Sequence, residues 1–280
     1  MVVIDFRLRP PVKGFLQMVM YAAAERRDRI TRQHGMEPAP SAQAQSMDQL
    51  LAEMDAAGVT CGVVMGRCSG LYGSVSNQEV ADIVRAWPGR FVGVGSIDPR
   101  DRRQAIAQID EALALGLKGI NLEPGAYAEP LHADDRRLYP IYAYCEDNGI
   151  PVTIMAGGSA GPDLSYTYPV HVDRVAGDFP QLRIAITHGG WPWVHEMLHI
   201  AFRRPNVYLS PDQYLCNMPG MQAWVEAANG FLADRFLYAS SYPFIGVEAY
   251  AQWFRGLAIR RELLDDLMGR NAQRFLGLTG

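Results

Sequence analysis

Eight short apolar segments alternate with longer segments of helical periodicity along this chain. The apolar segments are rich in valine and isoleucine and lie at residues 2–8, 61–66, 91–97, 118–123, 151–157, 182–188, 206–210 and 235–241. Continuous apolar runs of this length are typical of strands buried on both faces, as in a parallel sheet. Eight strand–helix repeats in 280 residues therefore predict one α/β domain over residues 1–280, a (β/α)8 TIM barrel.

The segments between the apolar runs carry helix signals. Residues 46–58 begin at Ser46, a residue type that caps helix N-termini, and end at Gly58, which suits a helix C-terminus. The same amphipathic pattern occurs at residues 101–116, 135–149 and 168–180. The first connection, residues 12–45, is much longer. Because a long loop at the mouth of a barrel often covers the active site, this segment is predicted to be a lid.

Composition argues against several classes of protein. The net charge of −4 leaves no basic footprint for nucleic acid. No stretch approaches the roughly 20 apolar residues of a membrane helix, and charged residues interrupt the N-terminal apolar run, so neither a membrane protein nor a signal peptide is expected. The cysteines form no C-x-x-C pair and lie at positions 61, 68, 145 and 216. Scattered cysteines of this kind predict reduced thiols and a cytoplasmic location.

The first apolar segment ends in "DFRLRP", residues 5–10, which places three charges in a predicted strand. Because side chains alternate along a strand, Asp5, Arg7 and Arg9 share one face. A buried guanidinium without a partner costs several kcal/mol on the usual order of magnitude. One interpretation is structural, with Asp5 paired to Arg7 and Glu123 paired to Arg9. The other is functional: an arginine faces a pocket, where it binds a carboxylate or stabilises an oxyanion.

Seven motifs, in their order along the chain, resemble those of the amidohydrolase-related family, also called amidohydrolase 2. They are "IDFRLRP", "NQEVADIVRAWPGRFVGVGSIDP", "DDRRLYPIYAYCEDNGIPVTIMAGG", "FPQLRIAITHGGWPWV", "PNVYLS", "DRFLYASSYPF" and "GRNAQRFLGL". The resemblance spans nearly the whole chain. The family includes aminocarboxymuconate semialdehyde and resorcylate decarboxylases, 4-oxalomesaconate hydratase and 2-pyrone-4,6-dicarboxylate lactonase. The resemblance therefore implies a barrel enzyme for a small carboxylated, anionic substrate, and it implies a homodimer as one form of assembly.

The functional positions of that family are mostly changed in this chain. Its two first-strand histidines fall on Arg7 and Arg9, its fifth-strand histidine falls on Met155, and its eighth-strand aspartate falls on Ser241. Only the sixth-strand histidine is kept, as His188. Arginine stays protonated and has no lone pair to offer a cation. Four such changes leave no plausible set of metal ligands, so the chain is predicted to bind no metal and to need no cofactor.

His188 is the strongest candidate for a catalytic residue, together with Arg7 and Arg9. It ends the sixth strand, at the rim where the active sites of barrels lie, and imidazole suits acid–base chemistry at neutral pH. A structural histidine is the alternative. The residues predicted to bind substrate are Arg67, Glu123, Met155, Trp191, Asp212, Ser241 and Tyr242. Asp212 is equally consistent with a pocket carboxylate and with a helix cap.

The other histidines are weaker candidates. His132 follows the fourth predicted strand and could reach the pocket. His195 and His199 lie four residues apart on one helix face, and they are interpreted as surface or packing residues because no acidic partner motif accompanies them.

Two classes of function remain open on the sequence. The leading hypothesis is a metal-independent hydrolase of a small carboxylated substrate such as a lactone, with an arginine polarising the carbonyl and His188 activating water. Decarboxylation and hydration compete with it, because the family resemblance implies both. The second class is a non-catalytic barrel that binds an anionic metabolite.

Overall fold

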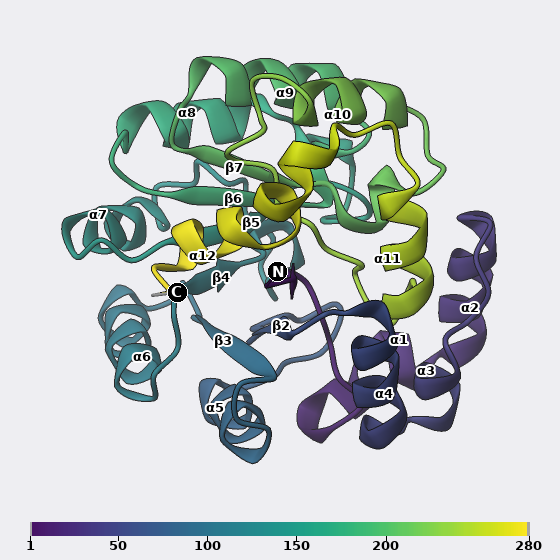
Figure 1. The fold of residues 1–280 in the computed structure, drawn as a ribbon. Coiled ribbons are helices and arrows are strands. Elements are labelled where there is room, and N and C mark those ends of the chain that lie inside the picture. Colours follow the sequence, from purple (N-terminus) through teal and green to yellow (C-terminus); the bar gives the residue numbers. More distant parts are fainter. Residues whose placement is uncertain (1, 279–280) are drawn as a thin grey trace.

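Seven parallel strands, hydrogen-bonded in sequence order, form the centre of this fold (Figure 1). The structure is a computed structural model that describes residues 2–278. The strands are β1 (Ile4–Asp5), β2 (Cys61–Met65), β3 (Phe91–Ser96), β4 (Ile120–Leu122), β5 (Val152–Met155), β6 (Ile184–Thr187) and β7 (Val207–Ser210). Their order places every predicted strand beside its neighbour in the sequence, as the repeated strand–helix pattern requires.

The eighth predicted strand closes the barrel without forming a regular strand. The backbone N–H of Leu237 donates to the carbonyl of Leu209 in β7 at 2.9 Å, and that of Phe6, just after β1, donates to the carbonyl of Tyr238 at 2.9 Å. Isolated parallel bridges join Leu8 to Tyr242 and Leu209 to Phe236. Residues 235–242 therefore lie between β7 and β1, and the predicted single-domain TIM barrel is confirmed.

The helices surround the strands, as Figure 1 shows. Those outside the first connection are α4 (Met47–Ala57), α5 (Asn77–Ala86), α6 (Arg102–Ala114), α7 (Tyr139–Asp147), α8 (Val170–Asp178), α9 (Val194–Arg203), α10 (Met221–Ala228), α11 (Val247–Arg255) and α12 (Asn271–Leu276). Ser46 caps α4 as predicted, accepting the backbone N–H of Gln49, and Gly58 ends it at a φ of 67°. No helix among residues 2–278 is long and apolar enough to cross a membrane.

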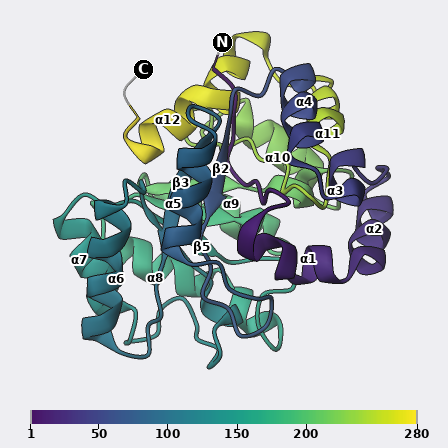
Figure 2. The ribbon, with the colours of Figure 1, turned by 90° about the horizontal axis from the view of Figure 1, so that it is seen from below.

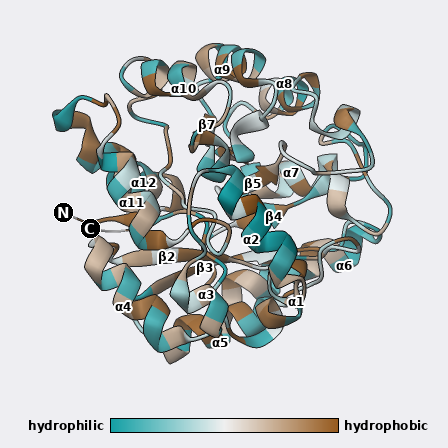
Figure 3. Cartoon of the chain, turned by 90° about the vertical axis from the view of Figure 1, so that its right-hand side faces the viewer, coloured by the Kyte–Doolittle hydropathy of each residue, from teal (hydrophilic) through white to brown (hydrophobic). Residues whose placement is uncertain are grey.

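The long first connection forms a helical wall at the C-terminal ends of the strands. It contains α1 (Val19–Ala22), α2 (Ala24–Gln33) and α3 (Pro40–Ala44), which group together in Figure 2. Figure 3 looks onto this end, where the hydrophilic α2 crosses in front of the strands. Several hydrogen bonds tie the segment to the barrel, and three of them join widely separated positions. The Tyr21 hydroxyl donates to the carbonyl of Arg9 at 2.7 Å, Thr31 donates to the carbonyl of Phe244 at 2.6 Å, and His34 contacts the carbonyl of Cys216 at 3.1 Å.

A separate apolar cluster fills the N-terminal half of the barrel interior. Ile4, Phe6 and Val63 belong to it, and Phe275 of α12 packs edge-on against Phe6 at 5.5 Å between ring centroids. The helix α12 thus covers the end of the barrel opposite to α2. Because apolar side chains fill this half of the interior, the polar side chains inside the barrel lie at the other end.

Asp5 joins the first strand to the closing segment. Its carboxylate accepts the backbone N–H of Ser240 at 3.0 Å, the Ser240 hydroxyl, and the backbone N–H of Arg7 at 3.1 Å. The ion pair expected between Asp5 and the Arg7 side chain is therefore wrong, because only the Arg7 backbone reaches the carboxylate. Burial raises the pKa of Asp5 to about 6, while the hydrogen bonds from Ser240 and Arg7 oppose that rise.

Replacing Asp5→Ala should destabilise the fold, because it leaves the buried N–H groups of Arg7 and Ser240 without an acceptor. We expect the free energy of unfolding to fall by about 3 kcal/mol in urea denaturation. Asp147→Ala, at an exposed aspartate that ends α7, is the matched control and should change little. A loss below about 1 kcal/mol for Asp5→Ala would show that closure of the barrel does not depend on this carboxylate.

Candidate active site

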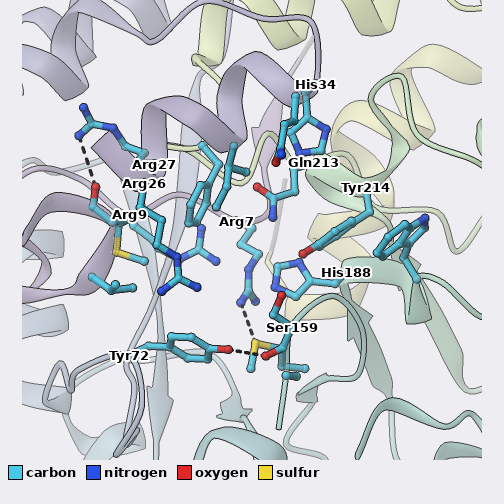
Figure 4. Close-up of a pocket in the computed structure, with 18 of the residues that line it drawn as sticks. Arg7, Arg9, Arg26, Arg27, His34, Tyr72, Ser159, His188, Gln213 and Tyr214 are labelled. Atoms are coloured by element: carbon cyan, nitrogen blue, oxygen red, sulfur yellow. Dashed lines mark hydrogen bonds between the residues drawn. The ribbon is translucent and has the colours of Figure 1, made fainter. Parts of the chain in front are cut away.

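A cavity of about 270 Å³ opens at the C-terminal ends of the strands, beneath α2 (Figure 4). Its ionisable lining consists of Arg7, Arg9, Arg26, Arg27, Arg67, His34 and His188, with the phenols Tyr72 and Tyr214. Met155, Trp191 and Phe244 add apolar wall. The two arginines that follow β1 and the histidine that follows β6 are therefore brought to one space, although they come from distant parts of the sequence.

His188 is held by Asp212 at the edge of this cavity. The His188 Nδ1 atom lies 3.0 Å from Oδ1 and 2.8 Å from Oδ2 of Asp212, and the His188 backbone N–H donates to the same carboxylate at 3.2 Å. Because the carboxylate is an acceptor, Nδ1 carries the hydrogen and Nε2 keeps its lone pair. Asp212 is fully buried, and its own carbonyl accepts the Tyr250 hydroxyl at 3.1 Å. The buried carboxylate of Asp212 therefore fixes the orientation of the His188 imidazole.

Two short helical turns bring these residues together. His188 opens the turn His188–Gly190 after β6, with a φ of 63°, and Asp212 opens the turn Asp212–Leu215 after β7, with a φ of 47°. Positive φ is uncommon for residues other than glycine and is tolerated where the surrounding structure demands it. Asp212 thus takes neither of the two expected roles, since it lies behind the cavity wall and caps no helix within residues 2–278. Its carboxylate binds His188 rather than capping a helix.

Burial lowers the pKa of His188, and the nearby guanidinium groups of Arg7 and Arg9 add to that effect, while Asp212 opposes it. The imidazole is therefore neutral at pH 7 and able to accept a proton at Nε2. Tyr214 packs edge-on against it at 5.1 Å and itself stacks on Trp191 at 5.0 Å. Tyr214 thus covers one side of the imidazole, and Trp191 supports Tyr214.

Glu123 lies behind the cavity wall and holds two of the arginines. Its Oε2 accepts Nε of Arg67 at 2.8 Å and also Nη2 of Arg67, while its Oε1 lies 3.6 Å from Nη2 of Arg7. Burial alone would raise the pKa of Glu123, but Arg67 and Arg7 outweigh it and hold that pKa at about 2. The expected pairing of Glu123 with Arg9 is therefore wrong, because Arg67, which follows β2, occupies the carboxylate.

The Arg7 side chain lies between two acids but hydrogen-bonds only to sulfur. Its Nη1 points at the Met65 sulfur at 3.8 Å and its Nη2 at the Met155 sulfur at 3.7 Å. Its Nε is 3.8 Å from Asp212 and has no hydrogen-bond partner. A thioether is a weak, neutral acceptor that fits beside a cation. Met155 thus serves Arg7 at the position where the related family has a histidine.

Arg9 is buried, and its side chain hydrogen-bonds to neutral oxygens only. Its Nη1 donates to the carbonyl of Ser241 at 3.2 Å, to the Ser241 hydroxyl at 3.2 Å and to the carbonyl of Tyr242 at 3.3 Å. No carboxylate among residues 2–278 forms an ion pair with it. Burial, together with repulsion from Arg7 and Arg67, lowers the pKa of Arg9 well below its usual range. Its guanidinium is therefore the group in the cavity wall that most needs an anionic ligand.

The predicted binding residues divide into two sets. Arg67, Met155 and Trp191 line the cavity. Glu123, Asp212, Ser241 and Tyr242 lie behind its wall, where they hold the residues that do. The Tyr242 hydroxyl lies 2.9 Å from the Ser41 hydroxyl, on the far side from Arg9.

Several lining residues escaped the sequence analysis. They are Arg26, Arg27 and His34 of the first connection and Tyr72, Gln213 and Tyr214 of later loops. The basic run "ERRDRITRQ" was the available signal, but periodicity does not tell which of its charges face the barrel. His132 does not line this cavity and instead stacks between Tyr166 and His171. His195 and His199 lie on α9, away from it.

The donors in this cavity do not fit a divalent metal. The cations Arg7 and Arg9 stand where the related family has ligands, and both acids nearest to them are engaged by arginine or histidine. Residues 2–278 contain no group of three or more histidine, cysteine, aspartate or glutamate side chains that could hold a metal ion. Guanidinium groups would repel such an ion and offer it no lone pair.

The barrel with its polar site at the C-terminal mouth is an architecture shared by many enzymes. A comparison with protein families identifies which kind this one is. The family model described as amidohydrolase, Amidohydro_2, matches residues 4–278. The chain therefore belongs to this amidohydrolase family, as its motifs predicted.

Three known proteins are similar to this chain in sequence or in fold. A curated 2-amino-3-carboxymuconate-6-semialdehyde decarboxylase of Dictyostelium discoideum is 27% identical over 72% of this chain and 65% of its own, so the match spans just under two thirds of that protein. An uncharacterised TIM-barrel protein of Bordetella bronchiseptica is 52% identical, with a TM-score of 0.96 over 99% of both chains. The 2,6-dihydroxybenzoate decarboxylase of Rhizobium shares the fold at 16% identity, with a TM-score of 0.75 over 100% of this chain and 99% of its own.

We expect purified protein to contain far less than one zinc, manganese or iron per chain, and added Zn²⁺ or Mn²⁺ to leave its melting temperature unchanged. The reason is the cationic wall formed by Arg7 and Arg9. Elemental analysis and a thermal melt with each metal test this. A content near one metal per chain, removed by a chelator with a fall in melting temperature, would contradict the prediction.

The low pKa of Glu123 predicts a specific dependence of stability on pH. Because its folded value of about 2 lies below the ordinary 4.5, its contribution is complete above pH 4.5 and is lost as the pH falls towards 2. Glu123→Gln should therefore cost a few kcal/mol at pH 7 and about 1 kcal/mol less at pH 3.5, measured by urea denaturation, because pH 3.5 lies below the ordinary pKa but still above the folded one. Glu37→Gln, at an exposed glutamate, is the control. A constant difference across this range would show that Arg67 and Arg7 do not lower the pKa of Glu123.

Proposed function

We propose that this protein is a lyase that removes carbon dioxide from a small, unsaturated or aromatic carboxylic acid. The observation that carries the proposal is the pairing, in one cavity, of a neutral His188 backed by Asp212 with an arginine, Arg9, that lacks an acidic partner. The first of these groups moves a proton, and the second binds an anion.

The reaction can be written for a carboxylate R–CO2⁻. The bond between R and the carboxyl carbon breaks, its electron pair stays on R, and carbon dioxide leaves. A proton then completes the new C–H bond, so the sum is R–CO2⁻ + H⁺ → R–H + CO2. His188 takes up this proton at Nε2 and delivers it to carbon, while Asp212 stabilises the imidazolium that forms in between.

Arg7 and Arg9 have different parts in this proposal. Figure 4 shows the Arg7 guanidinium between Arg9 and His188. Arg7 is thus placed to stabilise negative charge that develops on the reacting part of the ligand. Arg9 anchors an anionic group of the ligand. Fixed cations in a buried site cost no reorganisation when charge appears, so they can supply electrostatic stabilisation without a metal.

Decarboxylation is preferred to the hydrolysis expected from the sequence because of the comparisons. The curated relative and the Rhizobium structure are both named decarboxylases. Hydrolysis of a lactone would use the same His188 as a base toward water. Both reactions need the same residues, so the choice between them is made by substrate and product.

We expect wild-type protein to release carbon dioxide from a member of a panel of hydroxybenzoates and muconate-type acids. His188→Ala should lower that rate by about 10²- to 10⁴-fold, because it removes the proton carrier, while ligand binding is kept. Arg9→Met should weaken binding as well. The assay follows carbon dioxide release and, separately, binding by calorimetry. His195→Ala, at an exposed histidine of α9, is the control and should behave as wild type.

Three other results of this assay would contradict parts of the proposal. Equal turnover by wild type and His188→Ala would remove His188 from the mechanism. Turnover confined to a parallel panel of lactones would replace the lyase with a hydrolase. Binding without turnover on both panels would indicate an anion-binding protein with no catalytic activity.

A further inference from the structure

The charges that line the cavity do not balance. Its wall carries five arginines and, among the residues that the structure describes, no aspartate or glutamate. Acids behind the wall neutralise part of this charge. Arg67 shares Glu123 with Arg7, and Asp212 lies 3.8 Å from Arg7 as well as holding His188.

A third arginine is neutralised within α2. Arg27 is buried, pairs with Asp28 at 2.8 Å, and donates to the carbonyl of Ala42 at 3.1 Å. It therefore acts as a structural residue of the helical wall, although its side chain reaches the cavity.

Arg9 and Arg26 are left without an acid. Arg9 donates to neutral oxygens at the floor of the cavity. Arg26 lines the cavity from α2, and within residues 2–278 its guanidinium makes no hydrogen bond or ion pair. Figure 4 shows Arg26 on the same side as Arg9, above Tyr72. The cavity thus presents two uncompensated positive charges, one buried and one at its rim.

An exposed arginine on a helix usually points into water and contributes little. Arg29 is such a case. It is also an arginine of α2, three positions after Arg26, but it is exposed and does not line the cavity. Arg26 differs from it by facing the same enclosed space as a buried, unpaired guanidinium. Charges in a cleft of low dielectric act on a ligand more strongly than the same charges on an open surface.

We infer that the ligand of this cavity is a dicarboxylate, with one carboxylate bound by Arg9 and the second recognised by Arg26. Two separated cations match two separated anions, and guanidinium groups bind carboxylates through paired hydrogen bonds. Arg26 is then a residue that determines specificity. That this dicarboxylate is also the substrate rests on the proposed function, whereas its binding does not.

For a decarboxylase the arrangement has a chemical consequence. A dicarboxylate that loses one carboxyl group gives a monoanion, −O2C–R–CO2⁻ + H⁺ → H–R–CO2⁻ + CO2. The product thus fills one of the two cationic positions and leaves the other empty. It should therefore bind more weakly than the substrate, which favours its release.

Binding of benzoate and of isophthalate, the corresponding 1,3-dicarboxylate, tests the inference without any turnover. At constant ionic strength we expect wild-type protein to bind isophthalate at least about tenfold more tightly, by calorimetry and by the rise in melting temperature. Arg26→Gln should remove most of this preference and leave benzoate affinity unchanged. Arg29→Gln, which removes the same charge from the same helix, should keep the preference. Sulfate, a compact dianion, should not bind as tightly as isophthalate, because its charges are too close together to reach both arginines.

Three results would overturn the inference: equal affinity for the two acids, no binding of either at millimolar concentration, or equal losses in Arg26→Gln and Arg29→Gln. The last would mean that only the overall charge of α2 matters. The proposed function is judged separately, by carbon dioxide release. Preference for isophthalate in a protein that decarboxylates nothing would therefore keep the inference and reject the lyase.

Discussion

Two buried carboxylates, Glu123 and Asp212, allow this barrel to keep charged groups at the C-terminal ends of its strands. Arg7 lies between them, 3.6 Å from one and 3.8 Å from the other. Glu123 also neutralises Arg67, and Asp212 also orients His188. Without these acids, the arginines would be buried without compensation, which costs several kcal/mol per charge on the usual order of magnitude. The orientation of His188 and the charge of the cavity both depend on this pair.

The four departures from the family's ligand pattern form two contacts. Arg7 hydrogen-bonds to the sulfur of Met155, and Arg9 hydrogen-bonds to the hydroxyl of Ser241. Each arginine thus meets a neutral acceptor at another of the changed positions. An imidazole or a carboxylate at those positions belongs with a metal cation, whereas a thioether and a hydroxyl suit a guanidinium. The changes are therefore consistent with one another as a cationic site of a different kind.

The parts that sequence predicted are those that follow from periodicity. Alternating apolar runs placed the strands, and the helix signals at Ser46 and Gly58 located α4 within a residue. Position at the end of a strand identified His188. Ion pairs were predicted less well, because alternation along a strand tells which face a side chain occupies but not which neighbour it meets around the barrel. Glu123 therefore pairs with Arg67 instead of Arg9, and Asp5 accepts hydrogen bonds from Ser240 and from the backbone of Arg7.

The sequence by itself determined that the chain is a barrel of this family, and that Arg7, Arg9 and His188 lie at the strand ends where such a barrel has its site. These conclusions need only hydrophobic period and the order of motifs along the chain. The tertiary structure decided which acid neutralises which arginine, that Asp212 holds His188, and that Arg26 faces the cavity while Arg29 does not. Those facts depend on the angle at which strands and helices pack, a long-range property that no local pattern of residues encodes.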